Sequence, residues 1–305
     1  MISRVLIADP FGSIDHVRRG LGPLPVDVVR AGVDLLTGAG VVALLVGPET
    51  PVTVAQLDAL PDLKIVAATS AGTDHVPVDE VTARGAWVTS AAGYCTDEVA
   101  EHTIALVLSL LRGVVPLNDA VRAGRWDVVE VAPRRVAGTV LGVVGFGAIG
   151  RAVATRASAL GMRVITYGGA SGSGGTDLAS LLAEAEVVTL HVPQRPGAAP
   201  VLDAASIGLL RPGAFVVNVA RGSVLDTAAL GEALRSGRIA GAALDVLPIE
   251  PPPPDDPVRT FPRTLLSPHA AWYSDEAAIR PYVWAGRAVA DVLAGRVPER
   301  VVGRP

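Results

Sequence analysis

The glycine-rich segment Gly145-Phe146-Gly147-Ala148-Ile149-Gly150 constrains the fold of this chain more than any other feature. An apolar stretch, residues 140–144, runs directly into it, and residues 151–160 follow with the Ala-rich composition of a helix. Gly161 is placed to end that helix, and a second apolar stretch begins at Arg163. Strand, glycine turn, helix and strand in one compact unit predict parallel strands with a dinucleotide phosphate site at the turn. We therefore expect residues 145–150 to bind a dinucleotide through backbone amides and the positive end of the helix dipole.

Apolar stretches alternate with helix-like segments along the rest of the chain. Continuous Val/Ile/Leu strands bounded by turns are typical of a parallel sheet that is buried on both faces. The alternation predicts the α/β class, with one doubly wound sheet in each half of the chain. The expected strands cover residues 5–8, 41–46, 64–68 and 87–89, and then 140–144, 163–167, 187–190, 214–218 and 241–245. A long apolar helix is expected over about residues 96–112, and Pro251 to Pro254 predict an exposed, extended loop.

Charge and cysteine content exclude several classes of protein. The 26 basic and 30 acidic residues give a net charge of −4, and no basic cluster indicates nucleic-acid binding. Cys95 is the only cysteine, so no internal disulfide can form. No apolar stretch approaches the roughly 18 residues of a membrane span. We expect a soluble, cytoplasmic protein without a metal site.

The end of the second strand bears on the choice between NAD and NADP. About 20 residues after the glycine turn, an Asp or Glu normally holds the adenine ribose of NAD. Here the count falls at Gly168 and the following glycine- and serine-rich residues, and Asp177 comes too late. No arginine follows at once to hold a 2′-phosphate, although Arg195 in a later loop could contact one. We expect NAD as cofactor, with NADP possible because Gly168 replaces the acidic residue.

Three segments near strand ends carry residues suited to chemistry on an organic acid. Arg221 follows one strand and can bind a carboxylate through two parallel hydrogen bonds. Asp245 ends another strand, and Glu250 enters the proline loop after it. His269 follows Pro268, and a histidine whose tautomer is fixed by a carboxylate is a suitable acid/base. Because ligands bind at the carboxyl ends of parallel strands, we expect these side chains near the cofactor.

Together these motifs resemble the D-isomer-specific 2-hydroxyacid dehydrogenases over nearly the whole chain. The subgroup that contains the C-terminal-binding-protein corepressors is the most similar, through residues 94–99 and 269–274. The motifs that carry the resemblance are Ala71-Gly72-Thr73-Asp74, Glu98-Val99-Ala100-Glu101-His102, the glycine turn, Val219-Ala220-Arg221-Gly222, Asp245 through Glu250-Pro251, and Ser267-Pro268-His269.

The resemblance implies a role for each matched residue. Arg221, Glu250 and His269 would be catalytic, with Arg221 on the substrate carboxylate, His269 transferring the proton and Glu250 paired with His269. The substrate would contact Ala71, Gly72, Thr73, Tyr94 and Trp272. The cofactor would contact Thr103, Gly145, Phe146, Gly147, Ala148, Ile149, Gly150, Gly168, His191, Val192, Pro193, Val219, Ala220, Arg221, Asp245 and His269.

The resemblance also implies an architecture and an activity. Residues 1–97 with 273–305 would form a flavodoxin-like substrate domain, and residues 98–272 an inserted Rossmann cofactor domain. The expected function is hydride transfer between a nicotinamide cofactor and a small D-2-hydroxy or 2-keto acid, in a homodimer. Two alternatives stay open: hydride transfer from another small anion such as phosphite, and a non-enzymatic binding protein that senses its cofactor.

Overall fold

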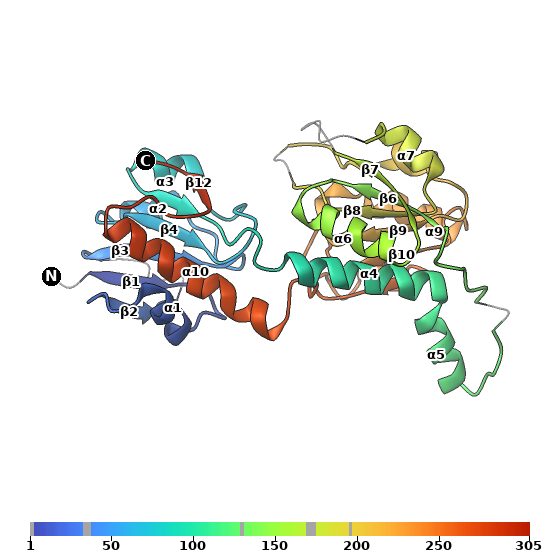
Figure 1. Cartoon of the computed structure of the whole chain (residues 1–305), viewed down its shortest axis with the longest axis horizontal. Coiled ribbons are helices and arrows are strands. Elements are labelled where there is room, and N and C mark those ends of the chain that lie inside the picture. The colour runs from blue at the N-terminus through green and yellow to red at the C-terminus, as the bar shows by residue number, and fades with distance from the viewer. Residues whose placement is uncertain (1–2, 33–37, 129–130, 169–174, 195–196) are drawn as a thin grey trace. The chain divides into compact units, whose positions relative to one another are not determined.

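The computed structural model describes residues 3–32, 38–128, 131–168, 175–194 and 197–305. The chain forms two compact units, which are described separately (Figure 1). The first unit comprises Met1–Cys95 and Ser274–Pro305, and the second comprises Thr96–Tyr273. The chain therefore leaves the first unit and returns to it after the second is complete.

The first unit is built on a six-stranded sheet in the order β12-β5-β4-β3-β1-β2. Its first five strands in sequence are parallel in the order 2-1-3-4-5, which is the flavodoxin-like doubly wound arrangement. β12 pairs with β5 in the antiparallel direction. The strands are β1 (Arg4–Ile7), β2 (Asp27–Arg30), β3 (Val41–Val46), β4 (Ile65–Ala68), β5 (Trp87–Thr89) and β12 (Val301–Gly303).

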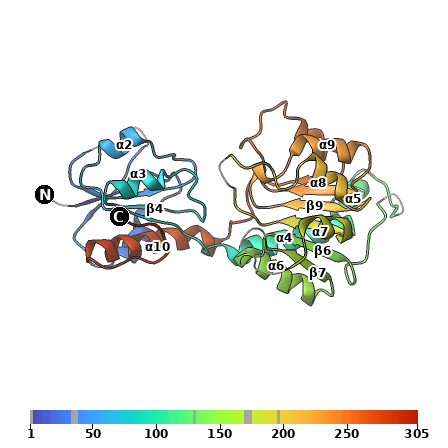
Figure 2. The same ribbon diagram turned by 90° about the horizontal axis from the view of Figure 1, so that it is seen from above.

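Helices cover both faces of this sheet (Figure 2). On one face lie α1 (Ile14–Leu21) and α10 (Asp275–Leu293), and on the other α2 (Val54–Asp58) and α3 (Val78–Ala83). Two glycines bring α1 and α10 into backbone contact. A Cβ on Gly20 would lie 2.1 Å from the Val283 carbonyl oxygen, and one on Gly286 would lie 2.3 Å from that of Val17. The C-terminal helix is thereby packed tightly onto the N-terminal half of the unit.

The second unit is a six-stranded parallel sheet in the order β11-β10-β9-β8-β6-β7. β8, β9 and β10 are buried along their whole length, as their continuous apolar sequences predict, whereas the edge strand β7 is partly exposed. The strands are β6 (Val140–Val144), β7 (Arg163–Tyr167), β8 (Val187–Leu190), β9 (Phe215–Asn218), β10 (Gly241–Leu244) and β11 (Thr264–Leu266).

The helices of the second unit also form two layers (Figure 2). The long helix predicted from the sequence is α4 (Thr96–Arg112), which packs against α6 (Ala148–Ala159), β9 and β10. α7 (Leu178–Glu184), α8 (Ala204–Leu209) and α9 (Thr227–Arg235) share the hydrophobic core of the other face. The remaining helical segments are α5 (Val114–Arg122) and the 3₁₀ turns Gly222–Val224 and Pro257–Thr260.

No single helix among the described residues is long and apolar enough to cross a membrane. α4 and α5 reach such a length only together, and the chain bends by 59° between them. α5 extends away from the sheet of its own unit (Figure 1).

The order of the second sheet reverses between β6 and β8, and open α/β sheets bind ligands at this reversal. The turns that leave these two strands meet there. Gly145 follows β6 with φ of 101°, and a Cβ on it would lie 2.5 Å from the carbonyl carbon of His191, which follows β8. The glycine turn and the His191 loop therefore stand together at the carboxyl edge of the sheet.

Candidate active site

The three glycines of the turn have three different environments. Gly145 is in a left-handed conformation against the His191 backbone. Gly150 packs on the turn itself, since a Cβ there would lie 2.1 Å from the Gly145 carbonyl oxygen. Gly147, in contrast, has no atom within 4 Å of the position that a Cβ would take. The first and third glycines close the turn, and the second leaves space above it.

The open position at Gly147 coincides with the beginning of α6. Gly147 is the N-cap of this helix, and no side chain caps its first amides. Unpaired amides at the positive end of a helix bind anions, and the space at Gly147 lets a phosphate approach them. The residues present therefore fit a dinucleotide, whose pyrophosphate would be held by the backbone of residues 147–149.

The end of β7 contains no acidic side chain among its described residues. Gly168 is partly buried directly after the strand, and residues 169–174 lie outside the described part of the chain. Asp177 is the N-cap of α7, where its carboxylate accepts a hydrogen bond from the Ser180 amide. Hydrogen bonds from Ser180 lower the pKa of Asp177 below its ordinary value. Asp177 is thus a helix cap rather than a substitute for the acidic residue expected at position 168, and Arg195 lies outside the described residues.

His191 is held in a single neutral state. Its amide donates to the Val144 carbonyl at 2.7 Å, and its Nε2 lies 3.0 Å from the Thr189 hydroxyl. Burial lowers the pKa of His191 to about 3, so the ring is uncharged at ordinary pH. Beyond it, Val192 is partly buried and Pro193 is exposed.

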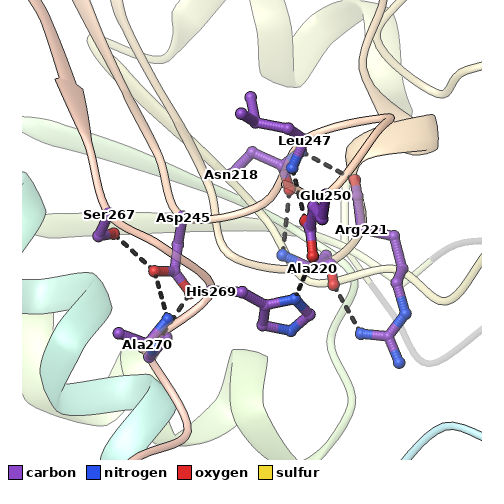
Figure 3. A network of polar contacts seen from close by, with 10 residues as sticks. Asn218, Ala220, Arg221, Asp245, Leu247, Glu250, Ser267, His269 and Ala270 are labelled. Carbon is purple, nitrogen blue, oxygen red and sulfur yellow. Dashed lines mark hydrogen bonds and ion pairs between the residues drawn. The ribbon is translucent and has the colours of Figure 1, made fainter. Parts of the chain in front are cut away.

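His269 and Glu250 form the central pair of the site (Figure 3). Nδ1 of His269 lies 2.6 Å from Oε2 of Glu250, and the other carboxylate oxygen accepts the Leu247 amide at 2.7 Å. Burial would raise the pKa of Glu250, but the hydrogen bonds from His269 and Leu247 and the charges of His269 and Arg221 hold it below its ordinary value. An ionised Glu250 accepts a hydrogen bond from the Nδ1–H group of His269. Nε2 of His269 can then exchange a proton with another molecule.

Arg221 lies at the end of a loop whose backbone is held by hydrogen bonds to the Asn218 side chain. Asn218 is fully buried at the end of β9; its side chain donates to the Arg221 carbonyl at 2.9 Å and accepts the Ala220 amide at 3.0 Å. The Arg221 guanidinium donates to the Ala220 carbonyl at 2.8 Å and is close enough to Glu250 for its charge to lower that carboxyl pKa. A guanidinium, an imidazole and a carboxylate therefore gather at one edge of the sheet (Figure 3).

Asp245 anchors the segment that carries His269. Its side chain is fully buried at the end of β10. One oxygen accepts the Ser267 hydroxyl at 2.6 Å and the Ala270 amide at 2.9 Å, and the other accepts the Ala271 amide at 3.0 Å. The Asp245 carbonyl accepts the His269 amide at 2.8 Å. His269 itself has φ of 51°, a left-handed conformation that these four hydrogen bonds help to impose.

Comparison with known proteins identifies the family. The family described as "D-isomer specific 2-hydroxyacid dehydrogenase, NAD binding domain" matches residues 104–271. A glycerate dehydrogenase from Methylorubrum extorquens is 34% identical over 84% of this chain and 82% of its own length. A glyoxylate reductase from Thermofilum pendens is 35% identical over 81% of this chain and 77% of its own length.

A solved structure agrees over the full length. The NADPH-dependent glyoxylate/hydroxypyruvate reductase from Sinorhizobium meliloti, in complex with NADP and malonate, superimposes with a TM-score of 0.84 at 29% identity, covering 100% of this chain and 99% of that one. The chain belongs to the D-isomer-specific 2-hydroxyacid dehydrogenase family.

Membership in this family confirms the class of reaction expected from the sequence. The dehydrogenase is an oxidoreductase that uses a nicotinamide cofactor and transfers a hydride between it and a 2-hydroxy or 2-keto acid. The relatives do not favour phosphite oxidation or a purely cofactor-sensing protein. The closeness to the corepressor subgroup stays a prediction, as do the dimer and the cytoplasmic localisation.

The structure brings together the three predicted catalytic residues and three of the predicted cofactor residues on the second unit. Arg221, Glu250, His269 and Asp245 lie in one network, and Val219 and Ala220 form the backbone beside it. Trp272 is partly buried and stacks edge-on against Tyr273, with ring centroids 5.4 Å apart. Thr103 has the ordinary environment of a core helix residue, because it is fully buried and its hydroxyl donates to the Val99 carbonyl. Its cofactor contact stays a prediction.

The remaining substrate residues are on the first unit. Ala71, Gly72 and Thr73 follow β4 at the carboxyl edge of its sheet, where the Ser70 hydroxyl donates to the Gly72 carbonyl at 2.7 Å. Tyr94 is buried, and its carbonyl accepts a hydrogen bond from Arg280. Within the described part of the chain, no group of three or more His, Cys, Asp or Glu residues could hold a metal ion.

Sequence reasoning did not assign a role to Asn218, Ser267 or His102. Asn218 closes the Arg221 loop, and the Ser267 hydroxyl and His102 Nε2 both approach the same carboxylate oxygen of Asp245. Asn218 ends the strand predicted over residues 214–218, and Ser267 and His102 lie inside motifs that carry the family resemblance. Asp245, the partner of Ser267 and His102, is far from both in the chain, so only the folded structure connects these three residues.

Proposed function

We propose that the dehydrogenase reduces 2-keto acids of the size of glyoxylate and hydroxypyruvate to 2-hydroxy acids, of the D configuration where the product is chiral, with His269 as the proton donor. The observation that carries this proposal is the 2.6 Å contact between His269 Nδ1 and the ionised Glu250. It fixes the ring so that Nε2 is the nitrogen offered to the substrate. The names of the relatives, a glycerate dehydrogenase and a glyoxylate reductase, support a small polar substrate.

Each residue of this cluster has a different role in the reaction. The guanidinium of Arg221 binds the substrate carboxylate and polarises the neighbouring carbonyl. His269 Nε2 gives its proton to the carbonyl oxygen as that oxygen becomes a hydroxyl, and Glu250 stabilises the charged ring beforehand. When bound, the nicotinamide supplies the hydride that the carbonyl carbon receives. In the opposite direction, His269 takes the hydroxyl proton.

Residues on the first unit complete the substrate contacts in this proposal. Backbone amides of Ala71, Gly72 and Thr73 bind the substrate carboxylate from a second side, and Tyr94 and Trp272 line the pocket of its side chain. Asp245, the Val219–Ala220 backbone and the His191–Pro193 loop contact the cofactor. The neutral state of His191 suits this role, because it neither attracts nor repels the phosphates as the pH changes.

Both NADH and NADPH are accepted in this proposal. A carboxylate at the end of β7 would bind the ribose hydroxyls of NADH and repel the 2′-phosphate of NADPH. Gly168 does neither, and the nearby Asp177 is committed to capping α7. The dehydrogenase therefore discriminates weakly, and NADPH binding is supported by the NADP complex of the related reductase.

The active form is a homodimer that uses α5 and the residues after it. Val114, Val115 and Val121 on this helix are exposed, and so are Trp126 and Val128 beyond it. Trp126 is 90% exposed. Large apolar side chains clustered on one protruding segment favour a covering partner, and a second copy presents a matching surface.

A panel of cofactor oxidation assays tests this function. NADH and NADPH are each followed at the nicotinamide absorbance with glyoxylate, hydroxypyruvate, pyruvate and phenylpyruvate, and the product is resolved on a chiral column. The proposal predicts the highest kcat/KM for glyoxylate and hydroxypyruvate, and a D product where the product is chiral. Turnover only with phosphite and NAD⁺, or none with any keto acid in protein that binds cofactor, would refute it.

A further inference from the structure

A chain of polar groups runs from α4 to the segment that carries His269. Its first member is His102 on α4, whose Nε2 lies 3.2 Å from the Ser267 hydroxyl and 3.7 Å from Oδ1 of Asp245. Ser267 lies 2.6 Å from the same Asp245 oxygen. The His102 ring is mostly buried, with 28% of its side chain exposed.

The hydrogen bonds of this chain can run in only one direction. A serine hydroxyl has one proton, and the short contact to a buried carboxylate takes it. Toward His102 the Ser267 oxygen is therefore an acceptor, so His102 must carry a proton on Nε2. His102 donates to Ser267, and Ser267 donates to Asp245.

Asp245 is the point at which this chain meets the backbone of the proton donor. Its carboxylate holds the amides of Ala270 and Ala271, and its carbonyl holds the amide of His269. These contacts surround a residue with φ of 51°. A carboxylate that rotated would release both amides, and the His269 ring would lose its alignment with Glu250.

We propose that His102 and Ser267 are positioning residues for His269, which they hold in its catalytic orientation through Asp245. The inference rests on the proposed role of His269 as proton donor. His102 and Ser267 act on kcat rather than on substrate binding, because they orient the proton donor and not the groups that bind the substrate carboxylate. Small displacements of an acid/base group lower rates steeply.

Paired substitutions test the row of hydrogen bonds from His102 through Ser267 to Asp245. His102→Leu and Ser267→Ala remove a member, whereas His102→Gln keeps a donor near Nε2 and Ser267→Thr keeps the hydroxyl. The first pair is expected to lower kcat about tenfold, with the substrate KM within about twofold. The second pair is expected to stay within about threefold of the wild type. Because both residues belong to one chain, the double variant His102→Leu/Ser267→Ala should fall no further than the single variants.

Two control variants separate this inference from its alternatives. His16→Leu on α1 of the first unit is the matched histidine control and should leave kcat unchanged. If His269→Gln kept wild-type turnover, the proposed function itself would fail. If His269→Gln were inactive while His102→Leu and Ser267→Ala kept kcat within twofold, the proton donor would stand and the positioning role would be overturned. A loss in the conservative variants equal to that in His102→Leu and Ser267→Ala would overturn it as well.

A measurement on the wild type removes the dependence on folding of the variants. The ¹⁵N shifts of the imidazole rings report which nitrogen of each histidine is protonated. The inference predicts a proton on Nε2 of His102, with the resonance assigned by its loss in His102→Gln. A neutral ring protonated on Nδ1 alone would overturn the donor chain.

Discussion

Glu250→Gln is the substitution that separates the charge of Glu250 from its hydrogen bond. Glutamine keeps an acceptor for His269 Nδ1 but removes the negative charge beside the ring. A hydrogen bond to a charged group stabilises by about 1.5–3 kcal/mol and a neutral one by about 0.5–1.5 kcal/mol. Because the Glu250 side chain is 36% exposed, we use the lower limit of each energy range, which gives a difference of about 1 kcal/mol between the two hydrogen bonds. That difference predicts a fall of about fivefold in kcat for keto-acid reduction.

Glu250→Ala should fall much further, because it removes orientation as well as charge. The alanine variant also loses the bond from the Leu247 amide, which shapes the loop. We expect a loss of about a hundredfold in kcat, within the range for general acid catalysis. Steady-state kinetics with glyoxylate at saturating cofactor measures both variants, and fluorescence titration checks that cofactor Kd is unchanged. Equal rates for the glutamine, alanine and wild-type proteins would refute the assignment of Glu250.

Three further predictions follow from other parts of the molecule. Gly168→Asp should raise the kcat/KM ratio for NADH over NADPH by about tenfold or more, since a carboxylate binds the ribose hydroxyls and repels the 2′-phosphate; an unchanged ratio would contradict the account of Gly168. His191 has a lower pKa folded than unfolded, so it costs stability as the pH falls from 6.5 toward about 3. His191→Gln should therefore lose less stability than the wild type in this window, by at most about 1.4 kcal/mol per pH unit, in unfolding scans against pH, and parallel curves would oppose this. Val121→Asp should halve the mass measured by light scattering, and a dimer of unchanged mass would argue against α5 as the interface.

The parts of the fold that could be predicted are those where an apolar run in the sequence corresponds to a strand buried on both faces. The strands of the second sheet are continuous apolar runs because both faces are covered, and the glycine turn has a conformation that other residues adopt at a cost. β2, β11 and β12 were not predicted. All three are short edge strands with exposed residues, so none shows a long continuous apolar run.

The candidate site was predictable in its residue types but not in its connections. Arg221, Glu250 and His269 stood out because charged groups followed apolar strands. The anchoring by Asp245, in contrast, depends on contacts across 22 to 26 positions in the chain, and no local pattern reports these. Likewise Asp177 is too late for a ribose contact by counting, but only the structure shows that it caps α7.

The most direct test of the central claim is a single-turnover measurement. The wild type and His269→Gln are each loaded with reduced cofactor, mixed with glyoxylate in a stopped-flow instrument, and followed at the nicotinamide absorbance. The account predicts that His269→Gln binds the cofactor as the wild type does but oxidises it at least a hundredfold more slowly, because no proton reaches the carbonyl oxygen. Oxidation at the wild-type rate in the variant would contradict the claim that His269 is the proton donor.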